Sequence, residues 1–430
     1  MAREMKDSGI EWIGDIPKEF NIIKFKYIFA IIGGNGFPEF LQGSESGEYP
    51  FCKVSDINGD SDYVDTAANY VSADIVQSHH FNIIPVNSII IAKIGAALHK
   101  NHRKVNSVPC CIDNNTQALV PIRNGSIRYL LYLTKCIDMA WFDNNSTVPS
   151  INNNKLLNFF VPNPNINDQH RIATFLDRKC AEIDSVIADT QKTIEEYKAL
   201  KQSIITEAVT KGVRGERKMK DSGVEWIGDV PEEWEVIPVK YVAEFQPSCD
   251  MSNLTDDSII TYLPMEHLKN GYYIQNTAFY GSVASSLTPF MNGDIVMAKV
   301  TPCFENGNIA IMNDLSSGVG MGSSELFVYR PLDVQTKYLL YWLQNILFKQ
   351  AACATMTGTG GLKRVSPYFA KHSKMTLPCY KEQLEIIRYL DEKCTSLDKL
   401  IESKQQLLTE LESYKKSVIY EYVTGKKEVL

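Results

Sequence analysis

A long internal repeat limits the possible folds of this sequence more than any other feature. Residues 5–17 are MKDSGIEWIGDIP and residues 219–231 are MKDSGVEWIGDVP, so eleven of the thirteen positions agree. The match continues with Lys-Tyr at 26–27 and 240–241. A second match at the same offset of 214 residues joins residues 169–180 to residues 383–394. A repeat of this length is too long for a solenoid unit and predicts two copies of one domain plan in the 430-residue chain.

Each half of the sequence ends in a segment with the pattern of a long helix. Residues 168–210 contain no proline or glycine, and apolar residues recur there with heptad spacing that the second copy keeps. Asp168 is the expected N-cap, and Gly212 and Gly425 are expected to end the two helices. One such helix, roughly 60 Å long, is not expected to be stable alone, so we expect the two to pair, most simply antiparallel. The predicted seam residues are Leu176, Ile183, Ile187, Ile194, Tyr197, Ile204, Leu390, Leu397, Ile401, Leu408, Leu411 and Val418.

The two middles, which lie between the repeated ends of each half, diverge and have the pattern of α/β structure. Residues 88–92 and 294–298 are predicted to be buried strands, because each is a short apolar run after a turn residue. Residues 129–137 and 338–348 are predicted to be buried helices. Residues 211–218, charged and broken by glycine, are predicted to link the halves.

The net charge of −7 does not favour DNA binding by itself, but its distribution does. The frame, which we define as residues 5–20, 168–212, 219–234 and 382–428, carries a net charge of −9, and the rest of the chain carries +2. Residues 75–112 hold four basic residues, four histidines and no acid. A second acid-free stretch, residues 334–380, holds six basic residues. Such stretches suit contact with phosphates, although a solvated surface is the simpler interpretation of either one alone.

The candidate DNA-contacting residues are basic or polar residues of the two middles, where loops rich in Asn, Ser, Thr and Gly offer partners for base edges. In the first half they are Lys93, His99, Lys100, His102, Arg103, Lys104, Thr147, Ser150, Asn152, Asn153 and Lys155. In the second half they are Lys299, Asn306, Ser323, Ser324, Thr357, Thr359, Lys363 and Arg364.

Motifs for catalysis or cofactor binding are missing from the sequence. It contains no G-x-x-x-x-G-K-[ST] phosphate loop, no [DNS]-P-P-[FY] motif of amino-methyltransferases and no H-E-x-x-H zinc motif. Residues 33–36 lack the third glycine of a dinucleotide fingerprint, and His79-His80 and His99-x-x-His102 have no carboxylate or cysteine at ligand spacing. We therefore expect a non-catalytic chain with no metal or cofactor of its own.

The cysteines and the N-terminal residues bear on the cellular compartment. Ten cysteines are scattered without a C-x-x-C pair, which is typical of reduced thiols in a cytoplasmic protein. The polar start of the sequence predicts no signal peptide, and no apolar run approaches the length of a membrane span.

The sequence resembles the specificity subunit of type I restriction-modification systems. The resemblance rests on the two openings at 5–17 and 219–231 and on the starts of the helical segments, Val161-Pro162…Gln169 and Leu377-Pro378…Gln383. It also rests on Thr-Val-Pro-Ser at 147–150 and on residues 293–306. The second half has Gly-Thr-Gly-Gly-Leu-Lys-Arg at 358–364 in place of the Thr-Val-Pro-Ser type of segment, which indicates a different subtype of recognition domain.

The resemblance implies a mixed α/β (α+β) fold. It has two globular target recognition domains joined by two long antiparallel coiled-coil helices, as an internal pseudo-twofold duplication. The expected boundaries are 1–160 for the first recognition domain, 161–214 for the first helix and linker, 215–376 for the second domain and 377–430 for the second helix.

The resemblance also implies a function. Each domain would read one half of a bipartite, gapped site on double-stranded DNA. The helices would set the gap and bind two methylation (M) subunits, and restriction (R) subunits would complete the enzyme. S-adenosylmethionine, ATP and magnesium would be bound by those partners. An autonomous DNA methyltransferase or nuclease and a coiled-coil scaffold without a role on DNA remain as alternatives.

Overall fold

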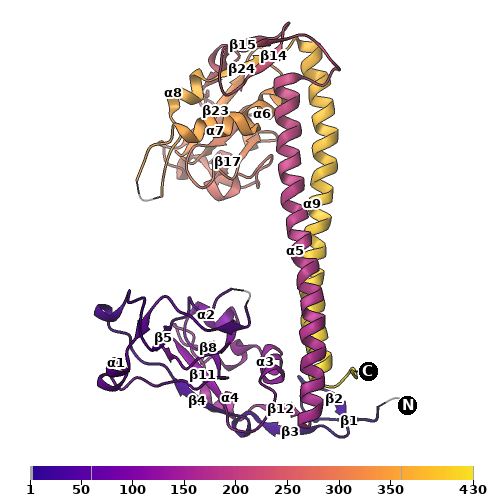
Figure 1. The fold of residues 1–430 in the computed structure, drawn as a ribbon. Coiled ribbons are helices and arrows are strands. Elements are labelled where there is room, and N and C mark those ends of the chain that lie inside the picture. The colour runs from indigo at the N-terminus through magenta and orange to yellow at the C-terminus, as the bar shows by residue number, and fades with distance from the viewer. Residues whose placement is uncertain (1–2, 60, 360, 430) are drawn as a thin grey trace. The chain divides into compact units, whose positions relative to one another are not determined.

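The computed structural model describes residues 3–59, 61–359 and 361–429, and the chain divides into two compact units. Unit 1 consists of Met1–Thr190 with Leu407–Leu430, and unit 2 consists of Gln191–Gln406. Each unit contains one mixed α/β domain and a part of both long helices, α5 (Ile166–Lys211) and α9 (Tyr380–Val423) (Figure 1).

The domain of unit 1 is built on a five-stranded sheet in the order β4-β11-β8-β9-β6. Its central strand β8 is fully buried, in agreement with the predicted apolar run at 88–92. The strands of this sheet are β4 (Phe29–Gly33), β6 (Tyr63–Val64), β8 (Ile89–Ala92), β9 (Arg103–Asn106) and β11 (Thr116–Pro121). The other strands of unit 1 are β1 (Met5–Asp7), β2 (Asp15–Pro17), β3 (Asn21–Lys24), β5 (Tyr49–Cys52), β7 (Tyr70–Val71), β10 (Cys111–Ile112) and β12 (Phe160–Asn163). Its short helices are α1 (Ala73–Ser78), α2 (Ala96–His99), α3 (Ile127–Lys135), α4 (Asn153–Leu157), η1 (Phe25–Tyr27), η2 (Glu39–Leu41) and η3 (Met139–Phe142).

The domain of unit 2 has two four-stranded sheets, in the orders β16-β23-β20-β21 and β18-β17-β22-β19. The first sheet contains β16 (Ala243–Phe245), β20 (Ile295–Ala298), β21 (Ile309–Ile311) and β23 (Leu326–Pro331). The second contains β17 (Ile259–Leu263), β18 (Thr277–Phe279), β19 (Thr288–Met291) and β22 (Val319–Gly322). The remaining strands are β13 (Met219–Asp221), β14 (Asp229–Pro231), β15 (Glu235–Pro238) and β24 (Lys374–Leu377). The short helices are α6 (Thr336–Gln344), α7 (Ile346–Ala354), α8 (Pro367–His372), η4 (Val239–Tyr241), η5 (Met265–His267), η6 (Tyr280–Ser282) and η7 (Ser316–Gly318).

Two details of the predicted helices are wrong. The segment 338–348 is not one helix, because Asn345 adopts an extended backbone and its Oδ1 accepts the N–H of Phe348 (2.9 Å), which ends α6 and caps α7. Asp168 is not the N-cap of α5, since the helix begins at Ile166 and Oδ1 of Asn165 accepts the Asp168 N–H (3.0 Å). The predicted ends are confirmed, because Gly212 and Gly425 follow the two helices with φ of +81° and +75°.

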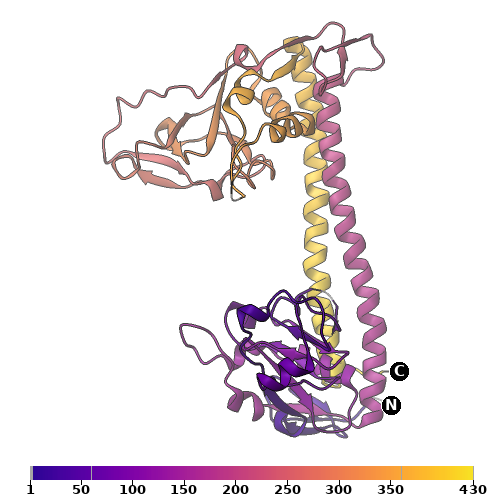
Figure 2. The ribbon, with the colours of Figure 1, turned by 60° about the vertical axis from the view of Figure 1, so that its left-hand side comes forward.

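The long helices run antiparallel within each unit. In unit 1 the rings of Phe175 and Tyr422 lie 4.3 Å apart, and Asp184 pairs with Lys415 at 2.6 Å, so rising numbers on α5 meet falling numbers on α9. In unit 2 Lys201 of α5 pairs with Asp398 of α9 at 2.7 Å. Figure 2 shows the two helices side by side from a second direction. The predicted fold class, mixed α/β domains with two long antiparallel helices, is confirmed.

All residues of the predicted seam are buried or partly buried. Buried among them are Leu176, Ile183, Ile194, Leu390, Leu397 and Val418. Partly buried are Ile187, Tyr197, Ile204, Ile401, Leu408 and Leu411. None of the described helices is long and apolar enough to cross a membrane.

Repeated side chains attach each domain to the helices. The buried hydroxyl of Tyr129 donates to the backbone carbonyl of Val423 at the end of α9 (3.2 Å), and that of Tyr338 donates to Val209 near the end of α5 (3.3 Å). In the same way, Oε1 of Gln169 on α5 accepts the N–H of Ser126 (3.1 Å), and Oε1 of Gln383 on α9 accepts the N–H of Gln335 (2.9 Å). These contacts between the middles and the long helices, which recur in both halves, therefore fix the position of each domain on the helices within its unit.

Candidate nucleic-acid interface

In unit 1, a polar loop is held at the end of the central strand β8. The N–H of Gly95 donates to the carbonyl of Pro149 (2.8 Å), and the N–H of Ile151 donates to the carbonyl of Lys93 (3.0 Å). These two bonds extend the strand and place Ser150 opposite Ile94 in a β-bridge. The hydroxyl of Ser150 accepts a hydrogen bond from Nδ2 of Asn144 (2.6 Å), so this position carries a neutral, hydrogen-bonding group.

In unit 2, a loop of different sequence is held in the same way at the end of β20. The N–H of Thr301 donates to the carbonyl of Lys363, and the N–H of Val365 donates to the carbonyl of Lys299, both at 2.9 Å. Applying the 214-residue offset aligns residues 149–151 with residues 363–365. The two loops therefore share one backbone arrangement although their side chains differ.

The residue before each of the loop segments 149–151 and 363–365 is apolar and exposed. Val148 is 58% exposed and Leu362, at the aligned position, is 54% exposed. Exposed apolar groups next to polar donors suit a nucleic-acid surface, where apolar side chains contact the methyl group of thymine.

The predicted contact residues of the first half differ in exposure. Exposed are His99, Lys100, Thr147, Asn153 and Lys155. Partly exposed are Lys93, His102, Ser150 and Asn152. The ring of His99 lies near the held loop, with Nε2 at 3.8 Å from Oδ2 of Asp143. Asn152 caps α4 by accepting the N–H of Lys155 (3.1 Å), and Oδ1 of Asn153 accepts from Nε2 of Gln117 (3.1 Å), so both have structural roles.

Arg103 and Lys104 do not have the exposure that a DNA contact needs. They lie on β9 and are only 6% and 8% exposed. The guanidinium of Arg103 donates from Nη1 to the carbonyl of Ile137 (3.2 Å) and from Nη2 to Oδ1 of Asn101 (2.9 Å). Burial lowers the pKa of Arg103 to about 10, which still leaves it charged at neutral pH. The acid-free stretch thus contains a buried structural cation as well as surface cations.

The predicted contact residues of the second half gather around the end of β20. Exposed are Asn306, Ser324, Thr357, Thr359, Lys363 and Arg364, and partly exposed are Lys299 and Ser323. Nζ of Lys299 donates to the carbonyl of Ser324 (2.7 Å), and Oγ of Ser323 accepts the N–H of Glu325 (3.2 Å). Arg364 forms two hydrogen bonds with Glu325, and this bonding holds the pKa of the Glu325 carboxyl below its usual value.

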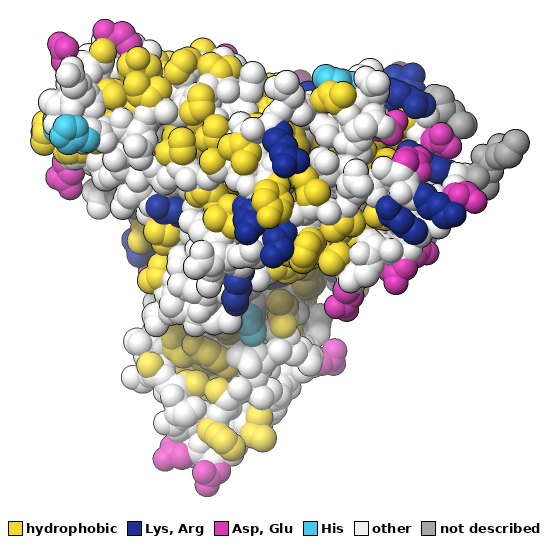
Figure 3. Space-filling model, turned by 90° about the horizontal axis from the view of Figure 1, so that it is seen from below, with side chains coloured by type: hydrophobic (Ala, Val, Ile, Leu, Met, Phe, Trp, Pro, Cys, Tyr) yellow, Lys and Arg dark blue, Asp and Glu magenta, His cyan; other side chains and the backbone are white. Residues whose placement is uncertain are grey.

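Sequence reasoning did not select a further group of cations that lie over aromatic rings. Figure 3 shows Lys and Arg side chains gathered among hydrophobic ones on one face of the molecule. In unit 1, Nζ of Lys26 lies 5.4 Å from the ring centre of exposed Tyr27, and in unit 2, Nζ of Lys240 lies 5.0 Å from that of exposed Tyr241. The repeated Lys-Tyr pair in the sequence was the available signal. An ammonium ion over an exposed ring can contact phosphates, bases or an acidic partner.

The long helices carry exposed apolar residues beside the seam. In unit 1 these are Val186 and Tyr414, and in unit 2 they are Leu200 and Leu400, each between 46% and 48% exposed. Val186 and Leu400 are related by the 214-residue offset, as are Leu200 and Tyr414. The heptad places all four at the g position, and in an antiparallel pair the g positions of both helices flank the same side of the seam. Each unit therefore has an apolar strip on its part of the paired helices.

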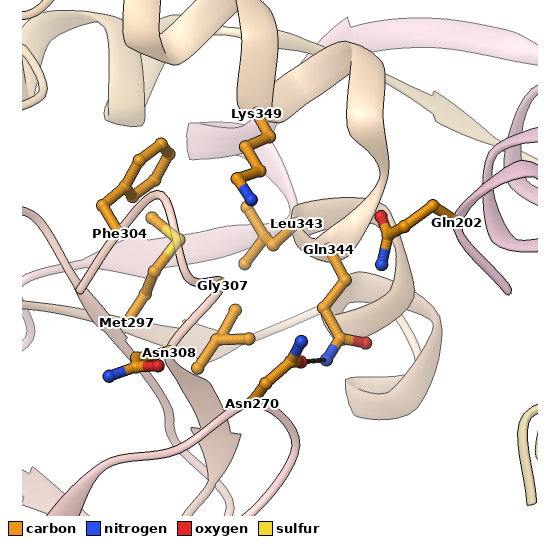
Figure 4. A pocket seen from close by; sticks show the side chains of 10 residues that line it. Gln202, Asn270, Met297, Phe304, Gly307, Asn308, Leu343, Gln344 and Lys349 are labelled. Carbon is orange, nitrogen blue, oxygen red and sulfur yellow. Dashed lines mark hydrogen bonds between the residues drawn. The ribbon is translucent and has the colours of Figure 1, made fainter. Parts of the chain in front are cut away.

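A small pocket in unit 2 lies between α5, α6 and α7 (Figure 4). Nε2 of Gln344 donates to Oδ1 of Asn270 (3.0 Å), and Oε1 of Gln202 is buried without a hydrogen-bond partner in the described part of the chain. Its lining is Gln202, Asn270, Met297, Phe304, Gly307, Asn308, Ile309, Leu343, Gln344 and Lys349. The amide and ammonium groups of this lining can hydrogen-bond, and the lining includes no acid, histidine or cysteine. Among residues 3–59, 61–359 and 361–429, no group of three or more His, Cys, Asp or Glu side chains could hold a metal ion.

Known proteins resemble this chain in sequence and in fold. Residues 17–197 match the family model of the type I restriction modification DNA specificity domain. The EcoAI specificity subunit of Escherichia coli is 33% identical over 195 residues, 44% of this chain and 32% of that subunit. The matched part thus spans about a third of that relative's length. The MjaVIII specificity subunit of Methanocaldococcus jannaschii is 24% identical over 302 residues, covering 66% of this chain and 65% of that subunit.

One solved structure shares the fold over nearly the whole length. It is a chain from work on the complex assembly and conformational transition of the type I R-M system. It superposes with a TM-score of 0.69 at 13% identity, covering 96% of this chain and 99% of that one. Residues 17–197 are therefore similar to the DNA specificity domain of type I restriction-modification enzymes, and specificity subunits of such enzymes are among the relatives of this chain.

Proposed function

We propose that this chain is the sequence-specific DNA-recognition subunit of a type I restriction-modification complex, in which each domain reads one half of a bipartite, gapped site. The observation that carries the proposal is the pair of held loops. Residues 149–151 and 363–365 have the same backbone hydrogen bonds to the ends of β8 and β20, yet they present different side chains. One backbone arrangement with two sets of side chains suits two different half-sites.

The exposed cations near these loops supply the contacts with phosphates. In the first domain these are Lys100 and Lys155, and in the second Lys363 is the exposed lysine of the loop. Polar residues of the same loops, such as Thr147 and Thr357, supply donors and acceptors for base edges. Binding through such contacts weakens as salt concentration rises.

The long helices have two roles in this proposal. They set the length of the unread gap, and their apolar strips bind two methylation subunits, one strip in each unit. The strips support this assignment because they are exposed, apolar and repeated at the 214-residue offset. Restriction subunits complete the assembly in the cytoplasm. S-adenosylmethionine, ATP and magnesium are bound by these partners, and this chain performs no catalysis.

Selection from a random DNA library tests the recognition role. The full chain, co-purified with a methylation subunit, should enrich a two-part motif with a fixed gap. Enrichment without sequence preference would contradict the proposal and favour a scaffold. Methyl transfer or DNA cleavage by the purified chain alone would favour an autonomous enzyme.

Insertion of one heptad at matched positions in α5 and α9 tests the spacer role. The selected gap should lengthen while both half-sites stay the same, because the seam register is kept. An unchanged gap in a complex that still assembles would refute the spacer role.

A further inference from the structure

The loop of unit 2 holds the backbone of Arg364 from two sides. The N–H of Arg364 donates to the carbonyl of Thr357 (2.8 Å), and the N–H of Thr357 donates to the carbonyl of Arg364 (3.1 Å). On its other side Arg364 forms a β-bridge with Val300, which follows β20. The Cα of Arg364 is therefore fixed relative to the central sheet, although the residue is exposed.

The side chain of Arg364 is fixed as well. Its Nε donates to Oε2 of Glu325 and its Nη2 donates to Oε1, both at 2.8 Å. The side chain is 46% exposed and that of Glu325 is 29% exposed. A guanidinium has five N–H donors, and two of them are used here. No other hydrogen bond from this guanidinium is found in the described part of the chain, so the edge formed by Nη1 and the second N–H of Nη2 is available to a ligand.

This available edge has the geometry of a bidentate donor. Two parallel N–H groups of an arginine match O6 and N7 of guanine in the major groove, which is the commonest specific contact between proteins and DNA. They also match a phosphate, but Glu325 places a negative carboxylate beside the guanidinium, and that carboxylate would repel a phosphate. A guanine edge is neutral, so the carboxylate orients the arginine without repelling that ligand.

The surroundings of the pair remain positive. Lys299 and the exposed Lys363 accompany Arg364 and Glu325, which gives this group of four side chains a net charge of +2. The aligned position in the first domain is Ser150, a neutral residue bonded to Asn144. The feature is therefore specific to the second domain and belongs to the part of the loop that differs between the two.

We propose that Arg364 reads a guanine in the half-site bound by the second domain, by donating from Nη1 and Nη2 to O6 and N7. Glu325 is a positioning residue that holds the guanidinium in the reading orientation. The inference rests on the proposed DNA-recognition function and names one base contact within it.

The test is the library selection with the full chain and its methylation subunit, using Arg364→Lys, which keeps the charge and removes the fork. One guanine in one half-site should become degenerate, with a loss of discrimination of about tenfold to a hundredfold at that position. The gap, the other half-site and the affinity for unrelated DNA should not change. Glu325→Gln should weaken discrimination at the same position by a smaller factor. Arg214→Lys, at an arginine paired with Glu385 outside the loop, is the matched control and should leave the motif intact.

Three outcomes would overturn the inference. A uniform loss of affinity for all sequences in Arg364→Lys would mean that Arg364 contacts a phosphate. An unchanged motif and affinity would mean that the pair with Glu325 is only structural. A wild-type complex that selects no two-part motif would contradict the proposed function and this inference together, whereas the first two outcomes leave the proposed function standing.

Discussion

Arg3 and Arg217 precede the two repeated openings and make equivalent contacts in their units. The contacts differ in how deeply they are buried. Arg3 lies over the ring of Phe20 and 3.7 Å from Asp168, and Arg217 lies over the ring of Trp234 and 2.7 Å from Glu382. The pattern of a cation, a ring and a carboxylate on the long helix is kept. The version in unit 2 is more buried, since the Glu382 side chain is 1% exposed and that of Asp168 is 19% exposed.

The middles of the two units, in contrast, differ in their sheets and in their loop residues. Unit 1 has one five-stranded sheet and a three-stranded sheet, whereas unit 2 has two four-stranded sheets. The held loops carry Ser150 in one unit and Arg364 in the other. The frame thus keeps its contacts while the middles change, which lets one architecture present two reading surfaces.

Removing the buried carboxylate of unit 2 should have the largest effect. Glu382→Ala leaves Arg217 without its buried partner and Nε1 of Trp234 without its acceptor (3.1 Å), which should cost about 4 kcal/mol of unfolding free energy in unit 2. Asp168→Ala, the aligned change in unit 1, should cost less than about 1 kcal/mol because the pair is longer and more exposed. Hydrogen exchange measured separately on the two units checks both values. Equal losses would show that the two versions of the frame do not differ in strength.

Removing a buried cation of the first middle should have the second-largest effect on stability. Arg103→Ala removes the donors to Ile137 and Asn101 and leaves a cavity, which should cost about 3 kcal/mol in unit 1. Lys100→Ala is the matched exposed change and should alter stability by less than about 0.5 kcal/mol. It should, however, reduce the salt dependence of DNA binding by about one phosphate contact. Urea unfolding and DNA titration at several salt concentrations measure the two effects. Weak DNA binding by a fully stable Arg103→Ala chain would instead indicate a direct contact.

An acid-sensitive network distinguishes the two domains. Burial alone would raise the pKa of Asp62, but ion pairs with Lys135 (2.5 Å) and Arg128 (3.0 Å) outweigh it and hold this pKa below 3.8. Because the folded-state pKa is lowered, the stabilisation is present above pH 3.8 and is lost as the pH falls through the folded-state value. Arg128, the residue before Tyr129, also pairs with Asp177 on α5, and Lys337, the residue before Tyr338, pairs with Asp391 on α9.

Asp62→Asn should therefore cost about 1 kcal/mol at neutral pH. The difference from the wild type should shrink below pH 3.8, as measured by unfolding of unit 1 across a pH series. A constant difference at every pH would show that the carboxylate is not the stabilising group.

The apolar strip should have the smallest effect on the chain itself. Val186→Glu changes an exposed residue, so the unfolding free energy should shift by less than about 0.5 kcal/mol. Co-purification with the methylation subunit should nevertheless fall, because a charge replaces apolar contact area. Ala188→Glu adds the same charge at an exposed position of the same helix and should leave assembly unchanged. Equal loss of assembly in both variants would mean that the strip has no special role.

The sequence predicted the frame better than the reading surface, for physical reasons. Heptad spacing and helix-ending glycines are local signals, so the long helices and their ends at Gly212 and Gly425 could be predicted. The N-cap prediction at Asp168 is wrong because Asn165, three residues earlier, takes that role, and the sequence alone does not fix where the first turn forms.

Burial within a sheet depends on contacts between distant segments. The sequence pattern therefore indicates Arg103 as a surface cation in an acid-free stretch. In the structure its guanidinium donates to the carbonyl of Ile137, which follows β11 and α3 in the sequence. The sequence carries little signal for the loop alignment, because Pro-Ser-Ile at 149–151 and Lys-Arg-Val at 363–365 share no identical residue. The sequence also does not predict that both loops are held at a strand end, because this arrangement depends on hydrogen bonds between residues more than 50 positions apart.

Methylome sequencing of cells that express this chain with its methylation and restriction subunits tests the central claim most directly. If each domain reads its own half-site, the modified positions should fall in one motif of two different specific parts separated by a gap of constant length. A continuous motif, or methylation without sequence preference, would contradict that claim.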